Sequence, residues 1–115
     1  MREDAFFQIS EEVRYVALYL DGQLSLRERP GLHNASASES DKYEELIVNP
    51  GVLTLVRQRG NIDCGGVEFV AVRYGNFWQT VWPVKRGHVS LGFELTANPV
   101  EHVKAIQKAI VDLEL

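Results

Sequence analysis

Residues 67–94 read VEFVAVRYGNFWQTVWPVKRGHVSLGFE, and this stretch decides the fold. Gly75-Asn76 and Lys85-Arg86-Gly87 are short connections of the kind that close antiparallel hairpins. The runs that they separate are rich in β-branched and aromatic residues, as strands are. We therefore expect three consecutive antiparallel strands, at residues 67–74, 77–84 and 88–95.

A second hairpin precedes this block. Residues 15–20 are continuously apolar, Asp21-Gly22 is a type I′ turn signal, and residues 23–29 return. The short turn sets the register and places Leu20 opposite Gln23. The returning strand is polar and charged and is followed by a proline, features that protect the edge of a sheet. We therefore place residues 23–29 at one edge.

Apolar residues at helical spacing predict helices at both ends of the chain and in the middle. Residues 3–13 form a short amphipathic helix, and Asn98-Pro99 begins a helix that continues to the end. Ser38 or Ser40 caps the middle helix, whose apolar stripe is Tyr43, Leu46 and Ile47.

Asn49-Pro50-Gly51 interrupts the middle helix, because the residue before a proline is pushed out of the α region. Pro50 then begins a second segment over residues 50–59, with Val52, Leu53, Leu55 and Val56 as its apolar residues. A strand is the alternative for this segment, and helix is preferred. Gly60 is a suitable C-terminal stop.

The order of elements is α-β-β-α-β-β-β-α, which predicts a single α+β domain over residues 1–115. Its five-stranded antiparallel sheet has the order 2-1-5-4-3, with helices on both faces. Strand 1 is apolar on both faces and therefore needs two neighbours. Strand 5 alternates most regularly between apolar and polar residues, so we place it beside strand 1. Strands 2 and 3 are therefore the edges.

Strand 67–74 is apolar on both faces, which is unusual for an edge. One face carries Val67, Phe69 and Ala71, and the other carries Val70, Val72 and Tyr74. A flat apolar edge is a template for pairing with another chain, so we expect a homodimer through this strand. The alternative is that a loop or helix of the same chain covers the edge. The inferred register places Phe69 opposite Trp82 and Arg73 opposite Trp78, the latter a candidate cation–π pair.

Composition excludes several classes of function. The 115 residues carry a net charge of -4, which argues against nucleic acid as a partner. No apolar run reaches the roughly 20 residues that span a bilayer, so we expect no membrane insertion. Residues 1–13 do not resemble a signal peptide, and a single cysteine fits a reducing cytoplasm.

We find no catalytic residues, no metal ligands and no cofactor site in the sequence. Cys64 could act as a nucleophile with His88 as its base, which requires the thiolate form. The negative charge of the preceding Asp63 disfavours a thiolate, so we interpret Cys64 as a packing residue. The histidines show no HxxxH spacing and there is no CxxC motif. Glu44 and Glu45 are adjacent and therefore point to different sides of a helix, so we interpret both as solvent-exposed rather than as a catalytic pair.

The chain resembles the Roadblock family (dynein light-chain type), whose fold is profilin-like, in the Asp21-Gly22 hairpin, the 67–94 block and the closing amphipathic helix. The resemblance implies dimers that join sheets at strand 67–74 and pack the middle helices together. It also implies a non-enzymatic adaptor or regulator of small Ras-like GTPases, or a scaffold for larger complexes. The interruption at Asn49-Pro50-Gly51 departs from the family pattern. The expected dimer interface consists of Val67, Phe69, Val70, Val72, Leu55 and Val56.

Two further hypotheses concern binding. The exposed side of the middle helix either docks an acidic partner or is simply solvated; its residues are Thr54, Arg57, Gln58 and Arg59. The alternative function is a small-ligand sensor of PAS or profilin-like topology, which needs an internal cavity. That cavity would be lined by Trp78, Trp82, Tyr43 and Phe93.

Overall fold

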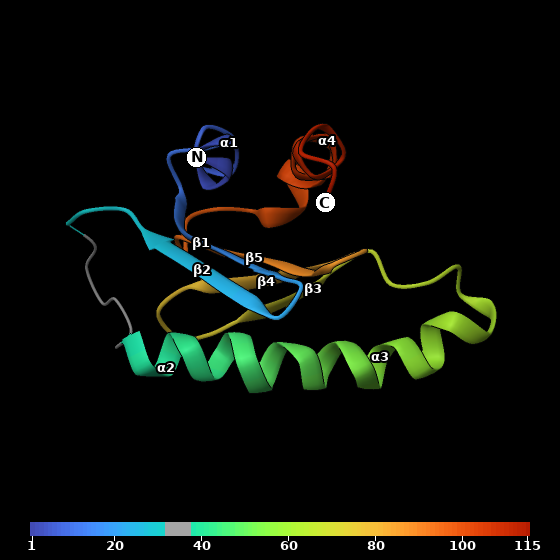
Figure 1. Ribbon diagram of the computed structural model, residues 1–115. Helices are drawn as coiled ribbons and strands as arrows, with labels where there is room; N and C mark the ends of the chain where they lie inside the picture. The colour runs from blue at the N-terminus through green and yellow to red at the C-terminus, as the bar shows by residue number, and fades with distance from the viewer. Residues whose placement is uncertain (32–37) are drawn as a thin grey trace.

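Five strands form one antiparallel sheet in the expected order, β2-β1-β5-β4-β3, in a computed structural model that describes residues 1–31 and 38–115 (Figure 1). The expected registers are also confirmed, with Leu20 opposite Gln23 and Arg73 opposite Trp78. Edge strand β3 is shorter than expected. The strands are β1 (Val13–Leu20), β2 (Gln23–Glu28), β3 (Val70–Arg73), β4 (Trp78–Val84) and β5 (Gly87–Phe93).

Helices cover both faces of the sheet, as expected. Helices α1 (Arg2–Phe7) and α4 (Val103–Asp112) lie side by side on one face, and a long helix runs along the other (Figure 1). The last helix begins as predicted, because the side chain of Asn98 accepts a hydrogen bond from the backbone N–H of Val100 at 3.2 Å. Its first turn is a 3₁₀ turn at Pro99–His102.

Helix α1 ends well before the expected residue 13. The guanidinium of Arg29 donates to the carbonyl oxygen of Phe7 at 2.8 Å and to that of Ser10 at 3.0 Å. Carbonyls at a helix end have no partner within the helix. Arg29 supplies one, so the chain can leave the helix early and start β1 at Val13.

The expected interruption of the middle helix is wrong. Helix α2 (Ser38–Tyr43), a π-helical turn (Glu44–Val48) and α3 (Asn49–Asp63) follow one another without a break. The backbone N–H of Asn49 donates to the carbonyl of Glu44, five residues earlier, and Pro50 occupies the first turn of α3. A proline is tolerated there because its missing N–H is not needed, and the wider turn before it avoids a clash. We call residues 38–63 the long helix.

The preference for helix over strand at residues 50–59 is confirmed, but Gly60 is not the stop. The long helix continues to Asp63 and is followed by Gly65 and Gly66 with φ of 78° and 87°. Gly60 serves packing instead. A Cβ at this position would lie 2.9 Å from Cγ2 of Val67, so the chain after the helix folds back closely over it.

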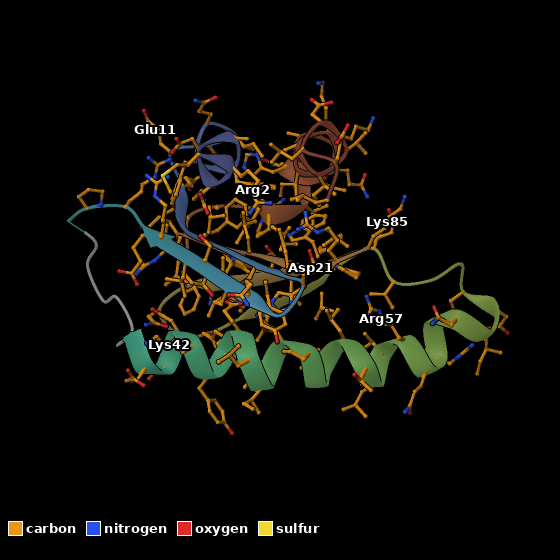
Figure 2. All side chains as sticks on the ribbon, viewed as in Figure 1. Arg2, Glu11, Asp21, Lys42, Arg57 and Lys85 are labelled. Carbon is orange, nitrogen blue, oxygen red and sulfur yellow. The ribbon has the colours of Figure 1, made fainter. Side chains whose placement is uncertain are left out.

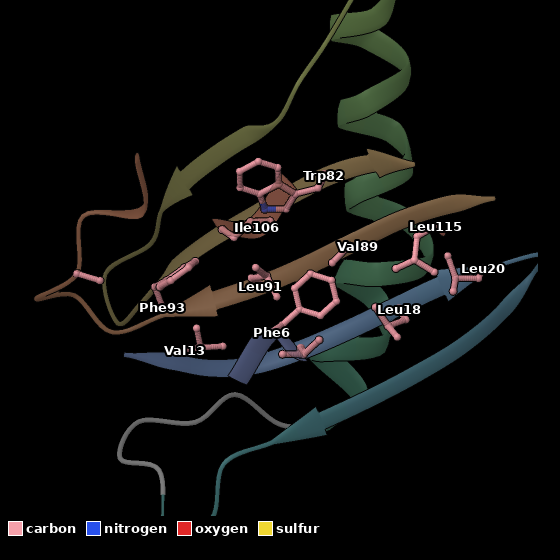
Figure 3. Packing of buried hydrophobic residues seen from close by; sticks show 12 residues of the cluster. Phe6, Val13, Leu18, Leu20, Trp82, Val89, Leu91, Phe93, Ile106 and Leu115 are labelled. Atoms are coloured by element: carbon pink, nitrogen blue, oxygen red, sulfur yellow. The ribbon is translucent and has the colours of Figure 1, made fainter. Parts of the chain in front are cut away.

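The apolar core lies between the sheet and helices α1 and α4 (Figure 3). Alternate residues of β5, namely Val89, Leu91 and Phe93, point into it together with Trp82 of β4. Phe6 of α1 and Ile106 of α4 close it from the helical side. The alternation predicted for the last strand is therefore confirmed.

Candidate protein-interaction surface

The long helix buries Leu53 but exposes five other large apolar residues to solvent. We call Tyr43, Leu46, Ile47, Leu55 and Ile62 the outer stripe; these side chains are between 45% and 74% exposed. The stripe expected from helical spacing therefore exists, but it lies on the side away from the sheet. Exposed large apolar side chains gathered on one side of a helix are typical of interaction surfaces.

The opposite side of the long helix is polar and buried against the sheet. Glu45 is 0% exposed, and its Oε1 lies 2.8 Å from Nε2 of His88 in β5. The amide of Asn49, one turn later, donates to the same Oε1 at 2.9 Å and lies 3.5 Å from the hydroxyl of Ser90. The interpretation of Glu45 as a solvated residue is therefore wrong.

Further polar side chains of the sheet extend this network. The hydroxyl of Tyr15 lies 3.3 Å from that of Ser90, and the amide nitrogen of Gln79 donates to the same Ser90 oxygen. We call the whole set the buried polar cluster: Tyr15, Glu45, Asn49, Gln79, His88 and Ser90.

Glu44 also turns toward the sheet, contrary to the expectation that it is solvated. Its two carboxylate oxygens accept from the hydroxyl of Tyr74 at 3.1 and 3.3 Å. Burial raises the pKa of the Glu44 carboxyl, and the Tyr74 hydrogen bond opposes this rise. Burial raises the pKa of Tyr74 as well, and the negative charge of Glu44 adds to the effect.

These polar contacts determine which side of the helix faces outward. Burying a carboxylate without partners is costly, and the hydrogen bonds to His88 and Asn49 offset that cost only in one orientation. Rotating the helix to bury the outer stripe would move Glu45 away from the sheet and leave His88 buried without its partner. The outer stripe therefore stays available for another molecule.

Strand β3 is an edge strand, as expected. Among residues 1–31 and 38–115 it pairs only with β4. Ala71 and Arg73 are exposed, and the guanidinium carbon of Arg73 lies 5.7 Å from the centre of the Trp78 ring, the expected cation–π geometry. An edge strand has backbone groups with no partner in its own sheet, which a second strand can bind.

The expected interface residues occupy different environments. Phe69 stacks on Trp82 with ring centres 4.5 Å apart and packs against the core, and Val67 contacts the Gly60 turn. Val70 and Val72 are half-buried on the side of the sheet that faces the long helix. Leu55 belongs to the outer stripe.

Arg57, one of the four expected partner-binding residues on the helix, lines a groove. Arg57 does so with Lys85, and the groove of about 710 Å³ lies between α3, the β4–β5 turn and α4 (Figure 2). The hydroxyl of Thr54 donates to the carbonyl of Pro50 at 2.9 Å, and Arg59 pairs with Asp63. Val56 of the expected interface is half-buried, and Gln58 of the partner-binding set is exposed.

The expected sensor pocket is not assembled. Trp82 and Phe93 are buried in the core on the α1 and α4 side of the sheet, whereas Tyr43 lies in the outer stripe on the opposite side. Trp78 packs at the border of that core. The four aromatic residues therefore line no common cavity.

The considered pairing of Cys64 with His88 is also not formed. Cys64 is exposed at the end of the long helix and its thiol donates to Asp63 at 3.5 Å, while the ring of His88 pairs with Glu45. The described residues contain no group of acidic, histidine and cysteine side chains that could hold a metal. His33, one of the three histidines considered as metal ligands, lies outside these residues. Over the same ranges no helix is long and apolar enough to cross a membrane.

The buried polar cluster was missed by sequence reasoning, although a signal for it exists. Glu45 and Asn49 are four residues apart, so they share a helix face, and His88 and Ser90 share a strand face. Polar residues that share one face of a helix, together with polar residues that share one face of a strand, indicate a buried network between the two. The indication is stronger when the apolar residues of the helix lie on another side.

This architecture, a five-stranded sheet between a long helix and two terminal helices, is the Roadblock/LC7 fold. The gliding protein MglB from Thermus thermophilus has a similar structure, with a TM-score of 0.68 and 12% identity over 94% of this chain and 82% of that one. A Roadblock/LC7 domain from Streptomyces avermitilis is similar as well, with a TM-score of 0.64 and 15% identity over 90% of this chain and 83% of that one. No protein-family model and no curated protein matches the sequence.

Proposed function

We propose that this chain is a non-enzymatic, dimeric adaptor or regulator module. The outer stripe carries the proposal, because it presents five large apolar side chains on one side of a helix whose other side is held by hydrogen bonds. The unpaired edge of β3 is a second surface that suits a copy of the same chain. The Roadblock/LC7 fold supports both, since the resemblance to that family implies dimers.

In this dimer the β3 edges of two protomers pair and their long helices pack at Leu55 and its neighbours. Val70, Val72 and Val56 lie next to these contacts, and Phe69 and Val67 support β3 from within their own chain. A dimer of this kind joins two sheets into one continuous sheet. The two long helices then lie next to each other on one face of that sheet.

Light scattering coupled to size-exclusion chromatography tests the dimer. Ile47→Glu places a charge in the outer stripe and should convert the dimer to a monomer. The matched control is Val111→Glu, because Val111 is 73% exposed on α4, on the opposite side of the sheet. A wild-type monomer at micromolar concentration contradicts the proposal.

Hydrogen exchange at β3 tests the pairing of edges separately. Alternate amides of β3 donate to β4, and those of Ala71 and Arg73 point to the free edge. These two amides should be protected at high protein concentration, and they should lose protection on dilution or in the Ile47→Glu variant. Protection that does not change with concentration would assign these hydrogen bonds to the protomer alone.

We further propose a small Ras-like GTPase as the partner, or a scaffolding role in a larger complex, in a cytoplasmic setting. Arg57 and Arg59, with Thr54 and Gln58 beside them, are the proposed contacts to an acidic surface of that partner. A purified Ras-like GTPase from the same organism should bind more tightly in one nucleotide state than in the other. Equal and negligible capture of the GDP and GTP-analogue forms would count against this partner.

Charge reversal locates the GTPase surface. Arg57→Glu should weaken binding, whereas Lys104→Glu, an exposed change on α4, should leave it unchanged. Both variants should remain dimers, so that a loss of GTPase binding is separated from a loss of dimerisation.

A further inference from the structure

The groove of about 710 Å³ lies at the end of the sheet where β4 turns into β5, between the long helix and α4 (Figure 2). Apolar side chains from separate parts of the chain form much of its wall. Val111 is the most exposed of them, at 73%, so this wall is open to solvent. The apolar residues of the lining are Val67, Pro83, Val84, Ile110, Val111 and Leu115.

Pro83 explains why the sheet opens at this end. The N–H of Tyr74 donates to the carbonyl of Phe77 at 2.9 Å, so Val70 and Val81, further along the same ladder, also form a hydrogen-bonded pair. The next bonded pair would need the N–H of residue 83, which a proline lacks. The ladder therefore ends at Val81, and the chain before Val70 continues without backbone pairing to β4.

The carbonyl of Pro83 points to the side where this pairing has ended. Backbone groups of successive residues in an antiparallel strand point to alternate neighbours, so Pro83 and Val81 share a direction, away from β5. The carbonyl of Pro83 accepts no hydrogen bond from residues 64–73, the chain on that side. The N–H groups of an extended peptide can supply the missing donor, as when a peptide adds a strand to a sheet.

Two cations of the groove have no anionic partner among residues 1–31 and 38–115. Arg57 of the long helix is half-buried and Lys85 of the β4–β5 turn is exposed, and neither forms an ion pair or a side-chain hydrogen bond with these residues. The neighbouring Arg59 and Arg86 both have a carboxylate partner. A half-buried guanidinium without a partner favours an anion that a ligand brings.

The acidic side chain of the lining belongs to another wall. Glu114 follows α4 and is exposed, and no ion pair joins it or Leu115 to Arg57 or Lys85. The wall formed by the long helix and the β4–β5 turn is therefore basic, although the chain as a whole has a net charge of -4. This basic wall favours an acidic ligand.

The groove lies on a different side of the long helix from the outer stripe. Leu55 of the stripe and Arg57 are two residues apart, which places their side chains roughly 200° apart around the helix. A ligand in the groove therefore does not use the outer stripe, and the two surfaces can be tested independently.

An extended segment that alternates acidic and apolar residues matches the groove. Successive side chains of such a segment point to opposite sides. Its acidic side chains can face Arg57 and Lys85 while its apolar side chains pack on Ile110 and Val111.

We propose that this groove binds an extended segment of a protein partner in which acidic and apolar residues alternate. The proposal shares Arg57 with the proposed GTPase contact but goes beyond it, because it gives the shape and the chemistry of the bound segment. It holds whether or not the partner is a GTPase, so a peptide can test it alone.

Fluorescence polarisation with labelled, blocked peptides tests the proposal. The probe is Gly-Glu-Leu-Glu-Leu-Glu-Gly, and its neutral control has Gln in place of each Glu. The probe should bind at least about tenfold more tightly, and its affinity should fall as the salt concentration rises. Equal affinity for the two peptides, or no binding of either up to millimolar protein, would overturn the proposal.

A second control peptide tests the apolar contribution. Gly-Glu-Ser-Glu-Ser-Glu-Gly keeps the charges of the probe but loses the burial of its two leucines. It should bind at least about tenfold more weakly than the probe. If it binds equally tightly, the attraction is electrostatic alone and the proposal is wrong.

A pair of arginine variants places the binding in the groove. Arg57→Gln removes the half-buried charge and should weaken binding of the probe about tenfold. Arg59→Gln is the matched control, because Arg59 is exposed on the same helix and lies outside the lining, and it should leave binding unchanged. Equal effects of the two variants, or no effect of Arg57→Gln, would contradict the proposal.

Two further variants separate this site from the proposed dimer. Val111→Glu places a negative charge in the exposed part of the apolar wall, so it should abolish binding of the probe and leave the oligomeric state unchanged. Ile47→Glu should do the reverse. If Val111→Glu keeps binding the probe, the groove is not the site. If Val111→Glu changes the oligomeric state, a second copy of the chain occupies the groove, and the proposal is wrong.

Discussion

The two faces of the sheet are built from the same strands but are stabilised in different ways. Along β5, Val89 and Leu91 point to the core under α1 and α4, whereas His88 and Ser90 point to the long helix. The first face is held by non-directional apolar burial. Apolar side chains such as Val70 and Val72 also lie on the second face, but its hydrogen bonds demand one orientation of the helix. This difference explains why one side of the molecule is closed and the other presents an apolar surface.

Removing a large side chain from the apolar face should have the largest effect. Phe93→Ala leaves a cavity in the fully buried core and should lower the free energy of unfolding by about 3–5 kcal/mol. Urea denaturation measures the loss. A loss below about 1 kcal/mol would mean that the core is not the main source of stability.

Breaking the polar face should cost less, and the cost should be recoverable. Glu45→Leu leaves His88 buried without its partner and should lower the free energy of unfolding by about 3 kcal/mol. The double variant Glu45→Leu/His88→Leu should recover part of this loss, since it removes the unpaired imidazole, while Asn49 still lacks the acceptor that Glu45 supplied. A double-mutant cycle in urea measures the coupling. Additive losses would show that the two side chains act independently.

The pH dependence of stability sharpens the comparison, because Glu44 belongs to the long-helix face and is half-buried there. The pKa of Glu44 is raised in the folded state from its ordinary 4.5, mainly by burial, so the folded chain holds this proton more tightly than the unfolded chain does. The stability that protonated Glu44 contributes to the folded state is therefore fully present below pH 4.5, and it is lost as the pH rises through the raised pKa. The Glu44→Gln variant should lack this component. Urea midpoints measured across acidic and neutral pH for both proteins give the difference, and identical pH profiles would contradict the assignment.

Surface ion pairs of the long helix should contribute least. Arg59→Gln breaks the exposed pair with Asp63 and should change the free energy of unfolding by about 0.5 kcal/mol or less. The same variant tests the partner surface, because a marked loss of GTPase binding with unchanged stability would assign Arg59 to recognition. Thermal unfolding monitored by circular dichroism measures the stability of the variant.

Most of the fold was predictable from sequence because it depends on local signals. The turn at Asp21-Gly22, with Asp21 at φ 53°, sets the first hairpin, and the short connections of residues 67–94 make β3, β4 and β5 neighbours. The pairing of β1 with β5 followed from the apolar faces of these two strands. The course of the long helix through Pro50 was not predictable in this way. The π-helical turn that accommodates the proline depends on contacts such as Glu45 with His88, which the local sequence does not reveal.

The candidate surface was predictable only in part. The β3 edge followed from strand order, and its apolar character from the residues themselves. The direction of the outer stripe did not follow, because helical spacing shows that Tyr43 and Ile47 share a face but not whether that face is buried. The groove lined by Arg57, Lys85 and Val111 combines residues of the long helix, the β4–β5 turn and α4, and no sequence signal predicted it.

By itself, the sequence determined the five strands, their hairpin registers and the alternation that builds the core, because these depend on neighbours a few residues apart. Only the tertiary structure decided which side of the long helix faces the sheet. That choice depends on hydrogen bonds between residues 43 positions apart, Glu45 and His88, whose energy depends on distance and direction rather than on composition.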